Sequence, residues 1–289
     1  MAEGNSGSLS FFSKNAVGCP VCGANFFKED LKTGRGRLIA GDLRKDFRRL
    51  YEPSQKYGAV YPLIYPVMVC PVCYYATFPQ DFTNITPDIK SRLEANTEQR
   101  AASIKTIFPE LDFESPRTLK EGAASYYFAA YCYDFLPPEL SPTIKRGIAT
   151  LRAAWLLEDL HKSFPGDNYD YLAKLFYRKA RFFYTLAIEY EQTGKESMAV
   201  MPNLGPDIDK NFGYDGVLYL AAYLEYFYGP SDDKEKRFKA LESAKRSVAR
   251  IFGMGKASKD KPTILLESAK ELRTQIAEEI GREGADGSA

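Results

Sequence analysis

Four cysteines are the side chains whose type and spacing most directly indicate chemistry. They form two copies of one short motif, Cys19-Pro20-Val21-Cys22 and Cys70-Pro71-Val72-Cys73. Two residues between cysteines allow a tight turn that brings both sulfurs to one ion. Proline presets that turn, and Gly23 after the first motif permits a left-handed backbone. The pair predicts one tetrahedral Zn²⁺ site formed by Cys19, Cys22, Cys70 and Cys73.

Two other interpretations of these cysteines are a disulfide pair and a redox-active Cys-x-x-Cys motif. Both explain a single motif better than they explain two. A site with four thiolates has no open position for water, which distinguishes structural zinc from catalytic zinc. We therefore expect the metal to hold the N-terminal part of the chain together rather than to catalyse a reaction.

Residues suited to catalysis are few. Cys132 lies in an aromatic, helical stretch without a nearby histidine, which favours a buried, inert thiol. His161 is the only histidine and lies near a predicted helix C-terminus, where a cation suits the helix dipole. The sequence contains no phosphate-binding loop, nucleophile elbow or dinucleotide fingerprint. An enzyme of unknown class remains an alternative, with a cleft expected near Asp42 and Asp46 or among the tyrosines of the helices.

The segment between the two motifs is basic and aromatic. From 31 to 57 it holds eight basic and three acidic side chains, a local charge of +5, and tyrosines continue to Tyr65. Such a composition could bind single-stranded nucleic acid, which makes the insert 31–65 an alternative functional site. The competing interpretation is a solvated helix face on which Arg44 and Arg48 flank an inward-facing Phe47. The overall net charge of +1 favours this second interpretation.

The composition indicates a globular protein without membrane insertion. The chain has 289 residues, 45% of them hydrophobic, and charges or prolines interrupt every apolar stretch. The N-terminus has neither the basic start nor the apolar stretch of a secretory signal. We therefore expect a cytoplasmic protein, in which thiols stay reduced.

Changes in composition and in apolar periodicity divide the chain into four parts. Residues 1–15 are predicted to be a disordered lead-in, 16–85 a zinc-knuckle domain of short strands and turns, 86–281 a helical domain, and 282–289 a disordered tail. Thr86, Ser115 and Ser141 each place a side-chain hydroxyl directly before a proline, which predicts a helix start. The Lys261-Pro262 pair is a weaker start signal. Apolar periodicity predicts helices over 87–108, 116–135, 142–163, 168–193, 214–229, 232–252 and 262–281.

The predicted fold class is mainly α, a zinc-stapled N-terminal domain followed by an antiparallel helical-repeat array. Helices of about 20 residues with alanines opposite bulky aromatics favour a degenerate tetratricopeptide-like array. The alternative is a closed bundle whose tyrosines fill one core.

A wider set of residues resembles the bacterial domain-of-unknown-function 2225 family. The resemblance is carried by both motifs, by Arg37, Asp42, Asp46-Phe47, Tyr51, Pro53 and Tyr57, by Val69 and Tyr75-Ala76, and by Leu151-Arg152, Ala154-Trp155, Tyr214-Asp215 and Leu218-Tyr219-Leu220. It covers nearly the whole chain and implies a metal site with tetratricopeptide-like helices and no established activity. Tyr74 stands where that family usually has a second glycine, so a left-handed backbone there would be strained.

These observations predict a structural zinc-binding protein whose helical scaffold binds a protein partner. Nucleic-acid binding through 31–65 and an enzymatic activity are the two alternatives.

Overall fold

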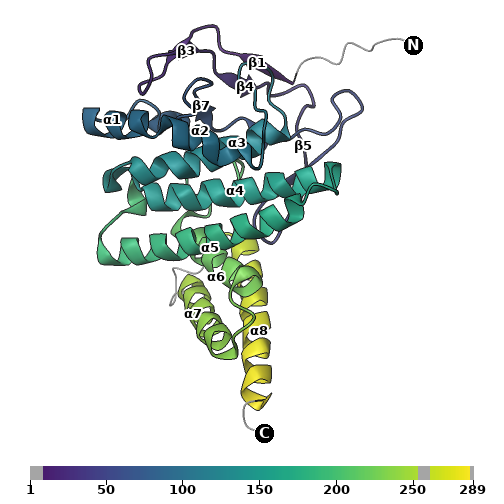
Figure 1. Cartoon of the computed structure of the whole chain (residues 1–289). Coiled ribbons are helices and arrows are strands. Elements are labelled where there is room, and N and C mark those ends of the chain that lie inside the picture. Colours follow the sequence, from purple (N-terminus) through teal and green to yellow (C-terminus); the bar gives the residue numbers. More distant parts are fainter. Residues whose placement is uncertain (1–8, 253–260, 287–289) are drawn as a thin grey trace.

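A computed structural model describes residues 9–252 and 261–286, with side chains described as far as 282. Short strands and turns come first and long helices follow (Figure 1). The strands are β1 (Ser10–Phe12), β2 (Val17–Gly18), β3 (Asn25–Phe26), β4 (Glu29–Leu31), β5 (Ile39–Leu43), β6 (Arg49–Glu52), β7 (Met68–Val69) and β8 (Ala76–Thr77). The helices are α1 (Pro87–Ala95), α2 (Thr97–Lys105), α3 (Leu119–Cys132), α4 (Pro142–Ser163), α5 (Tyr169–Thr193), α6 (Gly213–Tyr228), α7 (Lys234–Phe252) and α8 (Thr263–Asp286).

The strands pair only two at a time. β2 with β3 and β7 with β8 form the hairpins that carry the cysteine motifs, and β1 pairs with β4. The predicted lead-in, 1–15, therefore contains strand β1, whereas residues 1–8 lie outside the described part. Strands of two to five residues cannot form a stable sheet by themselves. They depend on the helices and on the cysteine cluster for their stability.

The insert between the motifs is a hairpin, so the predicted helix face around Phe47 is wrong. β5 pairs antiparallel with β6, with an irregular register between Ala40 and Leu43. Phe47 has a φ of 62°, which no helix residue adopts, and it closes the turn between the two strands. Arg44, Lys45 and Arg48 belong to this turn, and Arg49 begins β6.

Two predicted helix starts are confirmed and two details are corrected. Thr86 caps α1, and α4 begins at Pro142. The start predicted at Ser115 is wrong, because Thr118 and Glu121 form a capping box and α3 begins at Leu119. Ser141 does not cap α4, since its hydroxyl donates to the Ser197 carbonyl instead.

The predicted helix 87–108 is two helices that meet at Asn96. The buried Arg100 donates to the carbonyl of Leu93, and the Thr97 hydroxyl donates to the same oxygen. These side-chain hydrogen bonds stabilise the break in the helical backbone hydrogen bonding between α1 and α2. At the other end of the chain, α8 continues to Asp286, into the predicted tail 282–289. Residues 287–289 lie outside the described part.

From α3 onward, each helix packs against the next one in the sequence. α5 lies between α4 and α6, and α3 and α8 occupy opposite ends of this series of helices (Figure 1). The predicted antiparallel array is therefore confirmed, and a closed bundle is excluded. Close packing of α4 on α5 depends on Gly147, because a Cβ there would lie 3.0 Å from the Tyr184 ring.

The two parts of the chain share one apolar core. Buried side chains form a continuous cluster that extends from the cysteine motifs through α3, α4 and α5 to α8. α4 buries most of its residues, because α3, α5 and the N-terminal loops surround it. No helix in the described ranges is both long and apolar enough to cross a membrane.

Candidate metal centre

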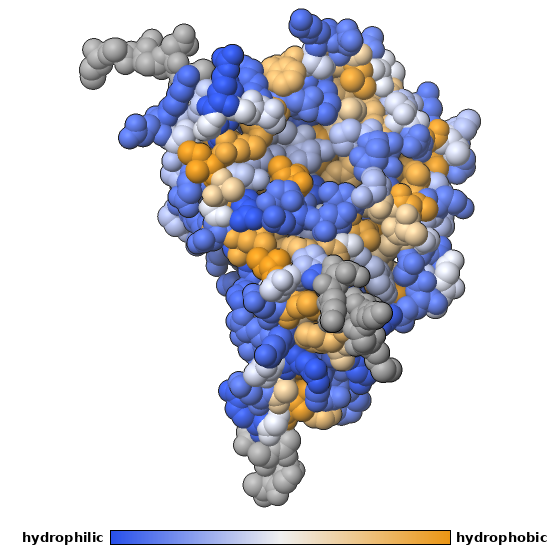
Figure 2. Space-filling model, turned by 180° about the vertical axis from the view of Figure 1, so that it is seen from behind, coloured by the Kyte–Doolittle hydropathy of each residue, from blue (hydrophilic) through white to orange (hydrophobic). Residues whose placement is uncertain are grey.

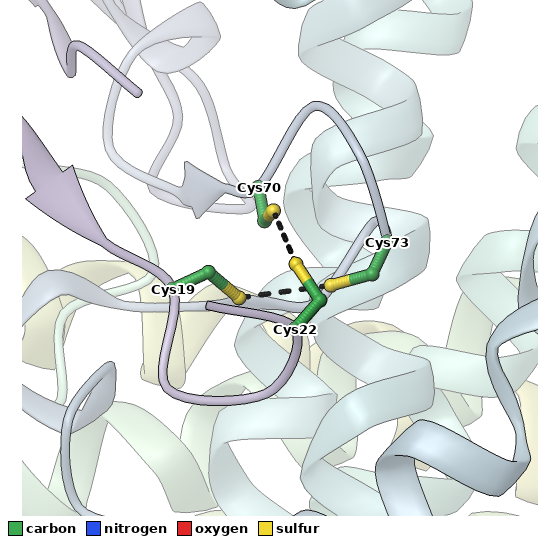
Figure 3. A group of neighbouring side chains, drawn as sticks. All are labelled: Cys19, Cys22, Cys70 and Cys73. Carbon is green, nitrogen blue, oxygen red and sulfur yellow. Dashed lines mark hydrogen bonds between the residues drawn. The ribbon is translucent and has the colours of Figure 1, made fainter. Parts of the chain in front are cut away.

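The first cysteine motif forms a tight, hydrogen-bonded knuckle. The amide of Cys19 donates to the carbonyl of Ala24 at 2.8 Å, and the amide of Gly23 donates to the carbonyl of Cys19 at 2.9 Å. Gly23 has a φ of 77°, in the left-handed region that glycine adopts at little cost. The turn directs both sulfurs to the same side of the hairpin (Figure 3).

The second motif repeats these bonds one for one. The amide of Cys70 donates to the carbonyl of Tyr75, and the amide of Tyr74 donates to the carbonyl of Cys70, both at 2.9 Å. Tyr74 therefore has a φ of 55°, which places a bulky residue in the left-handed region. Its ring stacks on Phe128 of α3 with a centroid distance of 4.9 Å, so packing offsets part of the backbone strain.

The four sulfurs converge on one point between the two knuckles (Figure 3). The Sγ atoms of Cys19 and Cys73 are 3.6 Å apart, as are those of Cys22 and Cys70, and all four lie within 4.8 Å of one another. A disulfide requires about 2.05 Å, and all five cysteines are free. A tetrahedron with metal–sulfur bonds of about 2.3 Å has edges of roughly 3.8 Å. The residues present thus fit one tetrahedral metal ion.

Hydrogen bonding within the cluster changes its acidity. Contacts with Cys70 and Cys73 lower the pKa of Cys19 to about 2. The contact with Cys19 raises the pKa of Cys70 to about 12, and it also raises the pKa of Cys73. Four thiolates at these separations repel one another, and a divalent cation offsets that repulsion. The donor set therefore suits a metal better than it suits a lone nucleophile.

The cluster is attached directly to the helical array. Arg100 of α2 is fully buried, and its guanidinium donates to the carbonyl of Cys73 at 2.7 and 2.9 Å. The thiol of Cys132 on α3 contacts the carbonyl of Tyr74 at 3.9 Å. The role of Arg100 could not be predicted from the sequence, because a single arginine in a polar helix is usually exposed.

The basic turn of the insert is neutralised by the helical array. Arg44 pairs with Glu158 at 2.6 Å, Arg48 pairs with Asp159, and both acids belong to α4. Two further pairs join Lys45 to Glu271 on α8 and Arg49 to Asp209 in the loop before α6. These charges hold the insert on the array, so they do not form an open cationic face for nucleic acid.

The structure does not bring together the two aspartates considered for catalysis. Asp42 is exposed on β5, whereas Asp46 is fully buried. Asp46 accepts hydrogen bonds from Trp155 Nε1 at 2.7 Å and from Arg44 at 2.9 Å. Burial raises the pKa of Asp46, although Arg44 partly opposes that rise. Its bonds link the insert to α4, which is a structural role.

The other two residues considered for catalysis are Cys132 and His161. Cys132 is buried, and burial raises the pKa of its thiol to about 11. His161 lies in the last turn of α4, with Nδ1 4.0 Å from the carboxylate of Asp170. Neither residue belongs to the group of four cysteines.

Fold and site together define a helical-array protein with a four-cysteine centre capable of binding a metal ion. Residues 12–276 match the family described as an uncharacterized protein conserved in bacteria, DUF2225. This chain belongs to that family. An uncharacterized protein of Borreliella burgdorferi strain B31 is 47% identical over 273 residues, covering 94% of this chain and 98% of that relative. No solved structure matches the chain.

Proposed function

We propose that the four cysteines bind one structural Zn²⁺ and that the helical array is a scaffold for binding another protein. The convergence of four sulfurs from two matched knuckles is the observation that carries the metal assignment. Thiolate ligands in a tetrahedral arrangement select Zn²⁺ among the common divalent ions of cells. The reduced state that such a site requires favours a cytoplasmic location.

The structural role of the metal follows from what surrounds it. Cys19, Cys70 and Cys73 are buried, and strands of two residues lead into and out of each knuckle. A structural zinc site contributes roughly 10–16 kcal/mol of binding free energy, far more than such short hairpins supply. The ion would fix the knuckles against α2 and α3 and so shape one end of the array.

The scaffold role is supported by large apolar side chains that the array leaves exposed. Tyr171, Phe182, Phe227 and Phe238 are each exposed by 41% or more. On the face shown in Figure 2, apolar residues reach the surface in several separate groups among polar ones. Exposed aromatic residues on a rigid support are common at sites of protein recognition. Within the described residues, no cluster of catalytic groups competes with this interpretation.

Chelation tests whether the metal is structural. Removing metal with an excess of a chelator should lower the melting temperature and should increase proteolysis within 16–85 before the array is cut. Restoring Zn²⁺ should reverse both effects. Loss of metal without any change in melting or proteolysis would contradict the structural role.

Affinity capture with chemical crosslinking from the native bacterium tests the scaffold role. The proposal predicts crosslinks from one recurring partner to the helices of the array, competed by excess untagged protein. A triple variant, Tyr171→Ser, Phe182→Ser and Phe227→Ser, should lose that partner while keeping its circular dichroism spectrum. Capture that this variant leaves unchanged would contradict a scaffold that acts through these exposed aromatics.

A further inference from the structure

α3, α4 and α5 lie next to one another in the array (Figure 1). Side chains of these three helices line an apolar groove. Its volume is about 660 Å³. Tyr127 and Tyr131 of α3 form one wall, and Phe176, Phe182 and Phe183 of α5 form the other. The rings of Phe182 and Phe183 pack edge to face at 5.3 Å, and Phe182 is 56% exposed. An aromatic surface of this kind is costly to leave in water.

The charged side chains that line the groove are all positive. They are Arg146 on its α4 floor and Arg178 and Lys179 on its α5 wall, and the lining includes no carboxylate. Arg146 pairs with Asp134 and lies 4.3 Å above the Phe183 ring. Arg178 and Lys179 are exposed, and neither has a carboxylate within 4.0 Å in the described part of the chain. The groove thus combines an apolar surface with uncompensated positive charge.

The length of the groove matches that of a short helix. Its α5 wall extends from Leu175 to Phe183, just over two helical turns or about 12 Å at a rise of about 1.5 Å per residue. α3 and α5 both pack against α4, and the floor residues Arg146 and Thr150 lie one turn apart on α4. A helix placed between two others presents apolar anchors at i, i+3 or i+4, and i+7. Two turns provide the length for three such anchors.

We propose that this groove binds an amphipathic helix of a partner protein whose apolar anchors are flanked by Asp or Glu. The aromatic walls receive the anchors, and the acidic side chains pair with Arg178 and Lys179. Charge complementarity selects an acidic helix, because a basic one meets the unpaired charges of Arg178 and Lys179 on the α5 wall. This inference rests on the proposed scaffold function and names the site and the class of partner.

The test uses the full chain with two fluorescein-labelled 16-residue peptides. Both peptides carry Leu and Phe at three anchor positions. One has Glu at its remaining charged positions and the other has Lys. Fluorescence anisotropy should show the Glu peptide binding at least tenfold more tightly. The double variant Arg178→Glu, Lys179→Glu should reverse that preference, and Phe182→Ser should weaken both peptides at least tenfold.

A matched control separates the groove from general charge. The variant Lys236→Glu, Lys239→Glu on α7 changes the net charge equally on exposed side chains, and it should leave both affinities unchanged. Equal effects of the two double variants would overturn the proposal. So would equal binding of the two peptides to the unmodified chain.

Two other occupants of the groove give different results. If the groove binds a second copy of the chain, sedimentation should show a dimer that Phe182→Ser dissociates. If it binds an anionic membrane, Arg178→Glu, Lys179→Glu should abolish binding to phosphatidylglycerol vesicles without affecting the peptides. Either result would contradict the proposal. If a partner is captured through other surfaces of the array, the scaffold function stands and only the assignment of the binding site to this groove is wrong.

Discussion

At the scale of single residues, the two knuckles reach the same geometry by different means. The left-handed position is Gly23 in the first knuckle and Tyr74 in the second, with φ values of 77° and 55°. A tyrosine in this region costs about 1–2 kcal/mol of backbone strain. Stacking on Phe128 offsets strain that a glycine would not incur. The second knuckle therefore depends on α3, whereas the first depends on its own backbone.

Replacing Gly23 with alanine should isolate this backbone strain. A Cβ at Gly23 meets nothing within 4 Å, so Gly23→Ala should lower the free energy of unfolding by about 1 kcal/mol through conformation alone. Gly166 is equally open but lacks a positive φ, and Gly166→Ala should change stability by less than about 0.5 kcal/mol. Urea denaturation of the metal-loaded proteins measures both values. Equal values would show that the knuckle needs no left-handed residue.

At the scale of elements, ion pairs hold the insert hairpin on the array. The side chains of Arg48 and Asp159 are each only 6% exposed. Asp159→Ala would leave the arginine buried without its main partner, which should cost about 3 kcal/mol of stability. Asp209→Ala breaks the more exposed pair with Arg49 and should cost less than about 1 kcal/mol. Thermal and urea denaturation measure the stability that each variant loses. A larger loss in Asp209→Ala than in Asp159→Ala would contradict the role assigned to the buried pair.

Features set by residues close together in the sequence could be predicted, whereas contacts between distant residues could not. The knuckles and most helix limits depend on local spacing, so periodicity and the twin motifs predicted them. The start of α3 was missed because Ser115 and Thr118 both have capping side chains, and only Thr118 has a glutamate three residues later. The pairing of Arg44 and Arg48 with Glu158 and Asp159 joins residues more than 100 positions apart. A local sequence pattern cannot predict an ion pair between such distant residues. The basic insert therefore resembled a nucleic-acid site.

At the scale of the whole molecule, burial leads us to expect that the array is more stable at α4 than at α7. α4 buries 17 of its 22 residues, whereas α7 buries four of its 19 and packs mainly on α6 and α8. Terminal units of a linear stack have fewer neighbours and open more readily. Hydrogen exchange should therefore be faster throughout α7 than in the middle of α4. Equal protection of the two helices would indicate a single cooperative unit instead.

We propose that Cys19, Cys22, Cys70 and Cys73, without Cys132, bind one zinc ion. Elemental analysis of protein purified without added metal tests it most directly. We expect one zinc per unmodified chain. Cys70→Ser should lose most of that zinc and melt at a lower temperature, whereas Cys132→Ala, whose thiol lies outside the cluster, should keep its full zinc content. A zinc content near zero in the unmodified protein, or unchanged metal content and melting in Cys70→Ser, would contradict the account.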